Sequence, residues 1–415
     1  MASGIRYRRM PGRGLINAKG GARMDTSGVS AYFYAGDFVE AARRYKDGEP
    51  QSYATHDELI RTFAAIGASG CPVDLYSFCT PTAVPAQEIF PNVRVTALGG
   101  THHRDPVLVE AFRRDPHPAA ICHIPSLALH YHAWRSDKRV LSVMASSFNT
   151  HGPRARLNFA LLRWLLNRPR FDFVANHCAP ATQLLARAGV DRDKLLAWNI
   201  PFHRSPGQRA PKAHRGAGDA TICYVGSVNE SKGVGDLLRA VATLRDDGVP
   251  VQATVVGGGD VVAMQELADA LGITDRVHLT GLIDNERAFA IMCESDAVIV
   301  PSRHDFQEGF PLVLFEALAS RTPIICSDHP IFATAFRAGT DALSFAARDH
   351  RDLARQVARL LGDDRLYAAL SAAADATWAR VTVAADWGTM ITDWVTSGAD
   401  SAYLRGMTLA SQERR

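Results

Sequence analysis

The chain has 415 residues, of which 47% are hydrophobic and 21% charged, and its formal net charge is +3. This composition excludes a disordered or fibrous protein, and so small a charge over this length does not indicate nucleic-acid binding. The length exceeds what one hydrophobic core usually organises, so we expect two domains. No apolar stretch approaches the roughly 18–20 residues that a membrane-spanning helix requires.

The cysteines are odd in number and lie at positions 71, 79, 122, 178, 223, 293 and 326. Their spacings match no zinc or redox motif, which predicts free and mostly buried thiols in a reducing compartment. We therefore expect a cytoplasmic protein, with the inner face of the membrane as an alternative location.

Residues 1–23 form a basic extension that contains six arginines and lysines and no acid. The extension lacks the apolar stretch of a signal peptide. We interpret it as a disordered segment, or as the product of an upstream start codon with Met24 as the true beginning. Contact with anionic lipid is the alternative.

The first half of the chain, residues 24–203, alternates short apolar runs with helical stretches. Residues 29–35 (VSAYFYA) form an apolar run ended by Gly36, which is typical of a buried parallel strand. A helical stretch at 56–68 follows. Further strands are predicted at residues 73–78, 93–97, 119–124, 140–146 and 171–175.

A change of character at residues 204–219 predicts an interdomain linker, since prolines, glycines and basic residues replace almost every apolar residue. The alternation then resumes in a second domain, residues 220–380. Its predicted strands are 220–225, 252–256, 277–280, 297–300 and 323–326. Its predicted helices are 233–246, 260–271, 286–294 and 311–320, followed by one helical stretch at 351–379.

Residues 381–415 are predicted to return to the first domain, because the apolar segment 387–395 (WGTMITDWV) suits a crossing helix. Strands that alternate with helices imply parallel sheets covered on both faces. Ligands bind beyond the carboxyl ends of such strands. With two such domains, the expected binding site is the cleft between them.

The most informative stretch is EGFPLVLFEALASRTPII, which begins at Glu308. Pro311 suits the first turn of a helix, so Glu308 lies in the loop before a helix N-terminus that favours an anion. Glu316 is the only charge between Leu312 and Ser320. A carboxylate on so apolar a helix needs a partner or a polar cleft. Two ribose hydroxyls would suit it, and an arginine or water is the alternative.

Seven residues separate Glu308 from Glu316, and this segment resembles the E-x7-E signature of the family-4 glycosyltransferases. The resemblance extends to segments in the same order: TICYVGSVNESKGVG, VVGGGD with RVHLTGLI, and SDAVIVPS. It covers residues 220–345 firmly and the first half loosely. The fold that it implies is α/β, with two Rossmann-like doubly wound domains that face a central cleft (GT-B).

The resemblance implies roles for residues around the E-x7-E segment. Glu316 holds the ribose hydroxyls of the nucleotide, and Glu308 contacts the donor sugar and the diphosphate. The backbone of Gly309, Phe310 and Pro311 takes part in these donor contacts.

The resemblance also places Lys232 against the diphosphate, whose negative charge grows as the glycosidic bond breaks. A lysine and a helix N-terminus can stabilise that charge without a metal. Gly226 lets the backbone approach the phosphates, and Ser227 and Gly36 complete the expected donor-binding set.

The sequence departs from the family at two points. Many members carry an arginine where this chain has Ser227, and Arg303 or His304 is a candidate replacement. The family often has a histidine at the end of a strand in the first domain. Here the strand at 140–146 runs into SSFNTHG, and we assign His151 to that role, with Asn149 as its competitor.

Other patterns favour no metal site. Asp191 and Asp193 match the D-x-D motif of metal-dependent glycosyltransferases, but they lie in a polar segment where acids are ordinary. The histidines at 102, 103, 123, 130 and 132 form no compact ligand set. Residues 257–259 (GGG) lack the third glycine of a dinucleotide fingerprint and are expected to shape a turn at the cleft.

Arg156, Arg163 and Arg170 recur every seven residues beside apolar positions. Such a stripe fits a domain helix with a solvated face, and contact with an anionic membrane is the alternative. In the second case the acceptor could be lipid-linked.

The resemblance implies an enzyme that moves a hexose-type sugar from a nucleoside diphosphate sugar to a hydroxyl acceptor, with retention of configuration. The acceptor is a glycan, a glycolipid or a small molecule, as in polysaccharide biosynthesis. Neither a cofactor nor a metal is expected. The alternatives are a non-catalytic subunit that binds a sugar nucleotide, and a sugar-nucleotide epimerase of the same fold.

Overall fold

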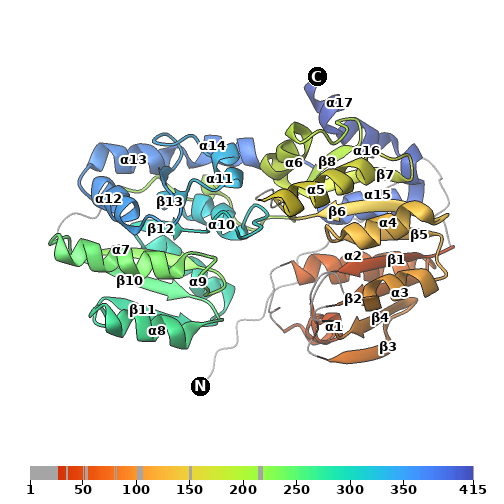
Figure 1. The fold of residues 1–415 in the computed structure, drawn as a ribbon, viewed down its shortest axis with the longest axis horizontal. Helices are drawn as coiled ribbons and strands as arrows, with labels where there is room; N and C mark the ends of the chain where they lie inside the picture. The colour runs from red at the N-terminus through yellow and green to blue at the C-terminus, as the bar shows by residue number, and fades with distance from the viewer. Residues whose placement is uncertain are drawn as a thin grey trace.

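The structure is a computed structural model that describes residues 27–33, 36–49, 51, 55–78, 80, 82–100, 106–148, 152–213 and 218–414. Two α/β domains stand side by side, each built around one sheet (Figure 1). This is the two-domain α/β architecture that the alternating pattern predicts.

The N-terminal domain is built on an eight-stranded sheet in the order β3-β4-β2-β1-β5-β6-β7-β8. Its strands are β1 (Val29–Phe33), β2 (Val73–Ser77), β3 (Ala83–Phe90), β4 (Val93–Leu98), β5 (Ala119–His123), β6 (Arg139–Met144), β7 (Phe171–His177) and β8 (Leu195–Trp198). All neighbours are parallel except β3, which pairs antiparallel with β4. β1, near the middle of the sheet, is buried at every position.

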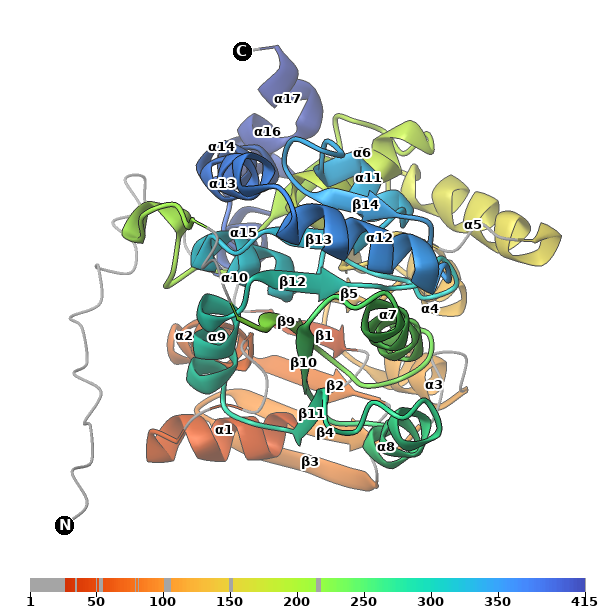
Figure 2. The ribbon, with the colours of Figure 1, turned by 90° about the vertical axis from the view of Figure 1, so that its left-hand side faces the viewer.

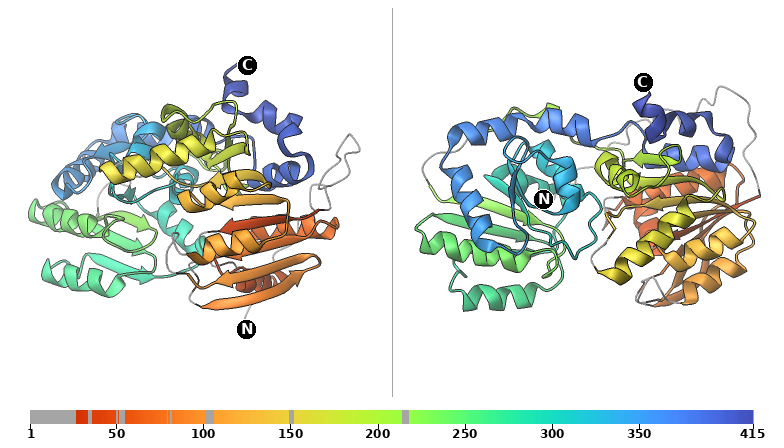
Figure 3. Two further views of the ribbon diagram at one scale, coloured as in Figure 1. Left: turned by 45° about the vertical axis from the view of Figure 1, so that its right-hand side comes forward. Right: turned by 45° about the horizontal axis from the view of Figure 1, so that its top comes forward.

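Helices from the first half of the chain cover this sheet. They are α1 (Phe38–Asp47), α2 (His56–Ala68), α3 (Pro106–Arg114), α4 (Leu127–Arg135), α5 (Pro153–Leu166) and α6 (Cys178–Arg187). The views in Figure 3 show helices on both faces of the sheet, as parallel strands joined by crossovers require.

The C-terminal domain has a six-stranded parallel sheet in the order β11-β10-β9-β12-β13-β14. Its strands are β9 (Ala220–Val225), β10 (Val251–Val256), β11 (Val277–Gly281), β12 (Ala297–Val300), β13 (Ile324–Ser327) and β14 (Leu343–Phe345). Its helices are α7 (Val234–Asp246), α8 (Val261–Ala270), α9 (Asn285–Glu294), α10 (Leu312–Ser320), α11 (Pro330–Ala335), α12 (His350–Leu361), α13 (Asp364–Ala372) and α14 (Ala374–Val381).

The last helices of the chain return to the N-terminal domain, as the apolar segment predicted (Figure 1). They are α15 (Trp387–Ser397), α16 (Ala402–Met407) and α17 (Leu409–Glu413). Trp387 and Trp394 of α15 are fully buried in the same core as β1 and α2. The short bridge between Leu196 of β8 and Thr408 holds the end of the chain on the sheet edge.

The linker makes more contacts with the C-terminal domain than its composition predicted. A short 3-10 helix, Pro206–Gln208, lies within it, and Pro206 is buried. Lys212 donates from Nζ to the carbonyl of Ser295 at 2.9 Å and to Oγ1 of Thr322 at 2.6 Å. Much of the described linker is therefore fastened to the C-terminal domain.

The helical stretch predicted at 351–379 as one unit is wrong in detail, because the structure divides it into α12, α13 and α14. Gly362 ends α12, and the Asp363 side chain caps α13 by accepting from the Leu366 N–H at 3.0 Å. A glycine signals the end of one helix, and a capping acid directly after it signals the start of the next.

Two expectations from composition can be compared with the described residues. Within these residues, six cysteines are free and five of them are buried, as expected; Cys79 lies outside them. No helix in the described part of the chain is both long and apolar enough to span a bilayer.

Candidate functional site

The structure brings together Glu308 and Lys232, the acidic and the basic residue that the sequence assigned to catalysis in the C-terminal domain. Nζ of Lys232 lies 2.5 Å from Oε1 of Glu308, and Oγ of Ser302 donates to the same oxygen. Glu308 is only 4% exposed. The Lys232 ammonium also lies 4.2 Å from the centre of the Phe306 ring. A buried carboxylate and a lysine thus meet directly before the N-terminus of α10.

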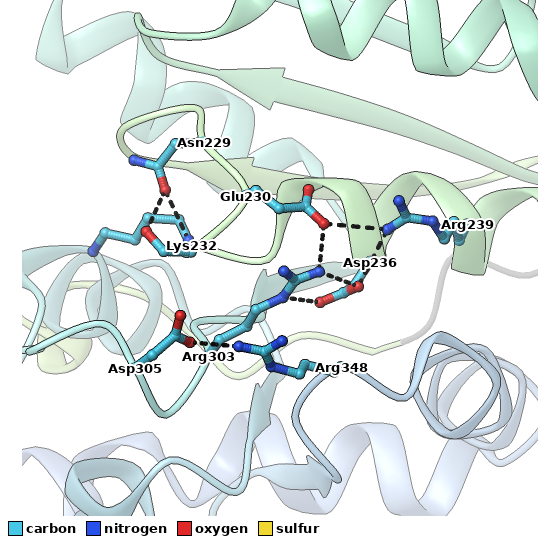
Figure 4. A network of polar contacts seen from close by, with 9 residues as sticks. Asn229, Glu230, Lys232, Asp236, Arg239, Arg303, Asp305 and Arg348 are labelled. Atoms are coloured by element: carbon cyan, nitrogen blue, oxygen red, sulfur yellow. Dashed lines mark hydrogen bonds and ion pairs between the residues drawn. The ribbon is translucent and has the colours of Figure 1, made fainter. Parts of the chain in front are cut away.

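The loop that carries Lys232 is shaped by its own side chains. Oδ1 of Asn229 accepts from the Lys232 N–H at 2.8 Å and from Oγ of Ser231 at 2.9 Å (Figure 4). Gly233 has a φ of +77°, and a Cβ there would lie 2.0 Å from the carbonyl oxygen of Pro301. Only glycine permits both this backbone conformation and this approach.

The turn after β9 requires two glycines, Gly226 directly after β9 and Gly257 directly after β10. Gly226 has a φ of +153°, and its N–H donates to the Val256 carbonyl at 2.9 Å. A Cβ on Gly257 would lie 1.8 Å from the Gly226 carbonyl oxygen. The expectation that residues 257–259 shape a turn holds for Gly257, which backs onto the Gly226 turn. The carbonyl of Ser227 accepts from the Tyr224 hydroxyl at 2.7 Å.

The loop before α10 touches the N-terminal domain. A Cβ on Gly309 would lie 2.7 Å from the carbonyl oxygen of Ala145, directly after β6. Phe310 is 2% exposed, and Pro311 occupies the N-cap position of α10, one residue earlier than a first-turn proline. The segment between Glu308 and α10 therefore lies where the two domains meet.

Glu316 lies on α10, which packs against α9. Burial raises the pKa of its carboxyl group, and a hydrogen bond with the Asn285 side chain opposes that shift. Its residue is partly exposed, between buried Phe315 and Ala317. The carboxylate can thus reach a ligand beside the start of α9.

Gly36, the expected donor-binding residue of the first domain, follows the carboxyl end of β1. It has a φ of +135°, and a Cβ there would lie 3.1 Å from Nε2 of His56. The position needs glycine for its backbone conformation, which is the property that a close approach to a ligand uses.

The C-terminal domain is similar to known glycosyltransferases. Residues 208–377 match the family described as glycosyl transferases group 1. A D-inositol 3-phosphate glycosyltransferase of Nocardia farcinica is 33% identical over 225 residues, which are 50% of this chain and 49% of that protein. The chain spans about half the length of the curated relatives it matches.

Solved structures match over both domains and show the GT-B fold. A sucrose-phosphate synthase of Thermosynechococcus elongatus has a TM-score of 0.60 at 18% identity and covers 88% of this chain and 96% of its own. The Anabaena protein HepE, solved in complex with UDP-glucose, has a TM-score of 0.59 at 14% identity, covering 89% and 98%. The two Rossmann-like domains expected from the resemblance are therefore confirmed.

Both candidate replacements for the family arginine contact acids in the structure. The Arg303 guanidinium, 9% exposed as a residue, binds both carboxylate oxygens of Asp236 at 2.7 and 2.8 Å and Glu230 at 2.6 Å (Figure 4). Nε2 of His304 lies 2.7 Å from Oδ1 of Asp328. Sequence reasoning missed these acids because the partners lie 67 and 73 residues away from Arg303.

His151 and its competitor Asn149 lie outside the described residues. His123 ends β5, and the prediction of the strand at 119–124 placed it inside a strand. Burial lowers the pKa of His123 to about 4, and its Nε2 accepts from Nε1 of Trp387 at 3.3 Å. Its ring also stacks on Phe33, so His123 is a packed histidine of the core.

His177 ends β7 and contacts the C-terminal domain. Burial lowers its pKa to about 4, and a hydrogen bond to the backbone of Phe310 opposes that shift. Its ring centre lies 5.8 Å from that of Phe315 on α10. The strand-end position was visible in the sequence, but nothing there linked this histidine to the E-x7-E segment.

Among the described residues, one group of acids and histidines could hold a metal ion: Asp74, Asp115 and His117. Asp74 is bound by Arg94 at 2.7 Å and His117 at 3.0 Å, and Lys138 lies 2.6 Å from Asp115. Existing cations neutralise both carboxylates. The group lies at the amino ends of β2 and β5, at the opposite edge of the sheet from a ligand site.

The D-x-D pair forms a surface turn. Oδ1 of Asp191 accepts from the Asp193 N–H at 3.0 Å, and Asp193 pairs with Arg414 at 3.2 Å. His130 is buried and bonds the Ser142 hydroxyl at 2.8 Å, whereas residues 102 and 103 lie outside the described residues. These contacts account for the described motif residues without a ligand.

A groove of about 880 Å³ lies on the outer side of the N-terminal domain, between β3, β4 and α3. Its lining includes Val84, Leu98, Val107 and Arg114, and it contains no residue of the segments that resemble the family. Its size therefore does not identify it as the donor site.

Proposed function

We propose that this chain transfers a hexose-type sugar from a nucleoside diphosphate sugar to a hydroxyl acceptor, with retention of configuration. The contact between Lys232 and Glu308 carries the proposal, because it places a cation and a buried acid directly before α10. The group 1 match and the GT-B fold support the same reading. HepE holds UDP-glucose, which makes UDP-sugars the first donors to test.

In the proposed mechanism, Lys232 compensates the charge that builds on the departing diphosphate. The N-terminus of α10 adds the dipole of its backbone N–H groups. Glu308 holds Lys232 in place before the donor binds, and we propose that it contacts the donor sugar afterwards. Glu316 binds the ribose hydroxyls. With these groups the leaving phosphate needs no metal, and it can itself take the acceptor proton.

A thermal-shift screen against UDP-, GDP- and ADP-sugars tests the donor class. We expect one nucleotide series to raise the melting temperature in a concentration-dependent way, since a ligand that binds only the folded state stabilises it. Sugar transfer to an added hydroxyl acceptor then separates the proposal from its alternatives. Donor binding without hydrolysis or transfer would indicate a non-catalytic subunit, and release of free nucleotide without transfer would indicate an epimerase.

Replacing Glu316 with alanine is expected to raise the KM for the donor by about 10- to 100-fold. Hydrogen bonds to a charged group contribute about 1.5–3 kcal/mol, and each 1.4 kcal/mol is tenfold. Donor titration in steady-state kinetics measures the change. Glu266→Ala is the matched control, because Glu266 is an exposed acid on α8. An unchanged donor KM in Glu316→Ala would remove the ribose role.

We also propose that α5 contacts an anionic membrane surface, so that the acceptor is lipid-linked. Leu157, Leu161 and Trp164 are 60%, 45% and 44% exposed and follow one another along one face of α5. Residues 152–170 contain five arginines and no acid. In Figure 2, α5 lies at the outer edge of the molecule. An apolar stripe with basic flanks fits an anionic interface.

The double variant Leu157→Glu with Leu161→Glu is expected to abolish co-sedimentation with phosphatidylglycerol-containing vesicles. Acids on the stripe would repel the anionic lipid and remove the apolar contact. Val262→Glu is the control, because Val262 is 73% exposed on α8 of the other domain. Equal sedimentation of the double variant and the control would exclude α5 as the contact.

A further inference from the structure

Arg303 joins two loops that both contribute to the proposed donor site. It follows β12, five residues before Glu308. Its side chain crosses to Glu230, in the loop between β9 and α7 that carries Lys232 (the lysine loop), and to Asp236 at the start of α7 (Figure 4). Its Nε and Nη2 bind both oxygens of Asp236, in the first turn of α7, at 2.8 and 2.7 Å. The same Nη2 binds Glu230 at 2.6 Å.

Backbone contacts reinforce this side-chain bridge. The Arg303 N–H donates to the carbonyl of Ser231 at 3.0 Å, directly before Lys232. Gly233, directly after Lys232, fits closely against the Pro301 carbonyl. The lysine loop is therefore held on both sides of Lys232 by residues of the segment that leads to Glu308.

The positive charge of Arg303 is balanced by the acids that it binds, so we assign it no contact with phosphate. Asp236 is 3% exposed, so its carboxylate needs a partner that is itself buried. A planar guanidinium binds one carboxylate through two parallel bonds and still reaches a second. Arg239 contacts the same acids from outside, at 3.3 and 3.5 Å, and is about one-third exposed. Removing Arg303 would leave Asp236 with this weaker, solvent-facing partner.

We infer that Arg303 is a positioning residue that aligns Lys232 with the departing diphosphate by clamping the lysine loop through Asp236 and Glu230. This inference rests on the proposed function and extends it. It predicts that Arg303 acts on turnover through Lys232 and makes no contact with the donor.

The test compares Arg303→Gln with Arg239→Gln, using UDP-glucose or the GDP- or ADP-glucose that the screen selects. We expect Arg303→Gln to lower kcat by about tenfold or more while the donor KM changes less, because a misplaced cation fails chiefly in the transition state. Arg303→Lys keeps the positive charge and should recover part of the loss. Recovery should be incomplete, because a lysine cannot bind both acids bidentately. Arg239→Gln should stay close to wild type.

A double-mutant cycle shows whether the effect passes through Lys232. In a Lys232→Ala background, Arg303→Gln should add little further loss of kcat, whereas a purely structural role would add its full loss again. Glu230→Gln provides a second variant should Arg303→Gln fold poorly, because Glu230 has a 48% exposed side chain. It should lower kcat several-fold, and again only when Lys232 is present.

The outcomes separate this inference from the proposed function. A wild-type protein that turns over none of the donors would overturn the proposed function. An active wild type in which Arg303→Gln equals Arg239→Gln, or in which its effect is undiminished without Lys232, would overturn the positioning role of Arg303.

Discussion

Lys232→Ala is expected to lower kcat by about 100- to 1000-fold, the range seen when one preorganised charge-stabilising group is removed from an active site. Lys232 meets Glu308 directly before α10. In the proposed mechanism, its ammonium complements a charge that appears fully only as the sugar–phosphate bond breaks. The donor KM should change much less than kcat. Steady-state assays over a range of donor concentrations measure both quantities, and single-turnover assays isolate the chemical step.

The control for this variant is Lys46→Ala, because Lys46 is an exposed lysine on α1 of the other domain. Loss of Lys232 also leaves the buried carboxylate of Glu308 without its cation, so a lower melting temperature is expected for Lys232→Ala. Lys232→Met in a Glu308→Gln background removes both charges and tests whether stability returns. Turnover of Lys232→Ala within twofold of wild type would exclude Lys232 from leaving-group stabilisation.

Much of the architecture follows from local patterns. The strands at the centre of each sheet, such as β1 and β12, are continuous apolar runs, because both of their faces are covered. The helix ends carry clear signals, including Gly233 before α7 and the acid that caps α9, Asp284. These features depend on a few neighbouring residues, so the sequence alone predicts them.

The missed strands lie at the sheet edges, where burial is incomplete. β3 is largely exposed, and β14 has three residues. An edge strand pairs on one side only, so it needs neither a long apolar run nor strict alternation. β8 was missed for a related reason. It has only four residues, its one neighbouring strand is β7 apart from the bridge between Leu196 and Thr408, and it packs against α6 and the returning C-terminal helices.

The residues of the candidate site also include some that the sequence predicts and some that it does not. Lys232 and Glu308 belong to segments whose sequence resembles that of a known family, so their contact could be expected. The partners of Arg303 could not be predicted, because Asp236 and Glu230 look like ordinary acids at the start of a helix. Sequence spacing gives no sign of which loop crosses to meet them. Long-range ion pairs of this kind depend on how β9 and β12 lie side by side in the sheet.

Trp394→Ala should destabilise the N-terminal domain by about 3–5 kcal/mol, the usual loss for a large buried aromatic residue. Trp394 is fully buried in the core shared by β1 and α2, and its Nε1 donates to Oδ2 of Asp172 at 3.0 Å. Burial raises the pKa of the Asp172 carboxyl, and the bond from Trp394 opposes this shift. The variant therefore creates a cavity and also removes a hydrogen-bond donor from a partly buried carboxylate.

For a domain of this size the loss corresponds to a fall in melting temperature of roughly 6–20 °C. Calorimetry is the suitable measurement, because two domains need not unfold together. Trp394→Phe keeps most of the ring and removes only the N–H, so about 1–2 kcal/mol is expected. Trp164→Ala, at a residue 44% exposed on α5, should have a much smaller effect. If Trp394→Ala melts like wild type, the returning helix α15 contributes little to the N-terminal domain, and its burial would then follow folding of the sheet without stabilising it.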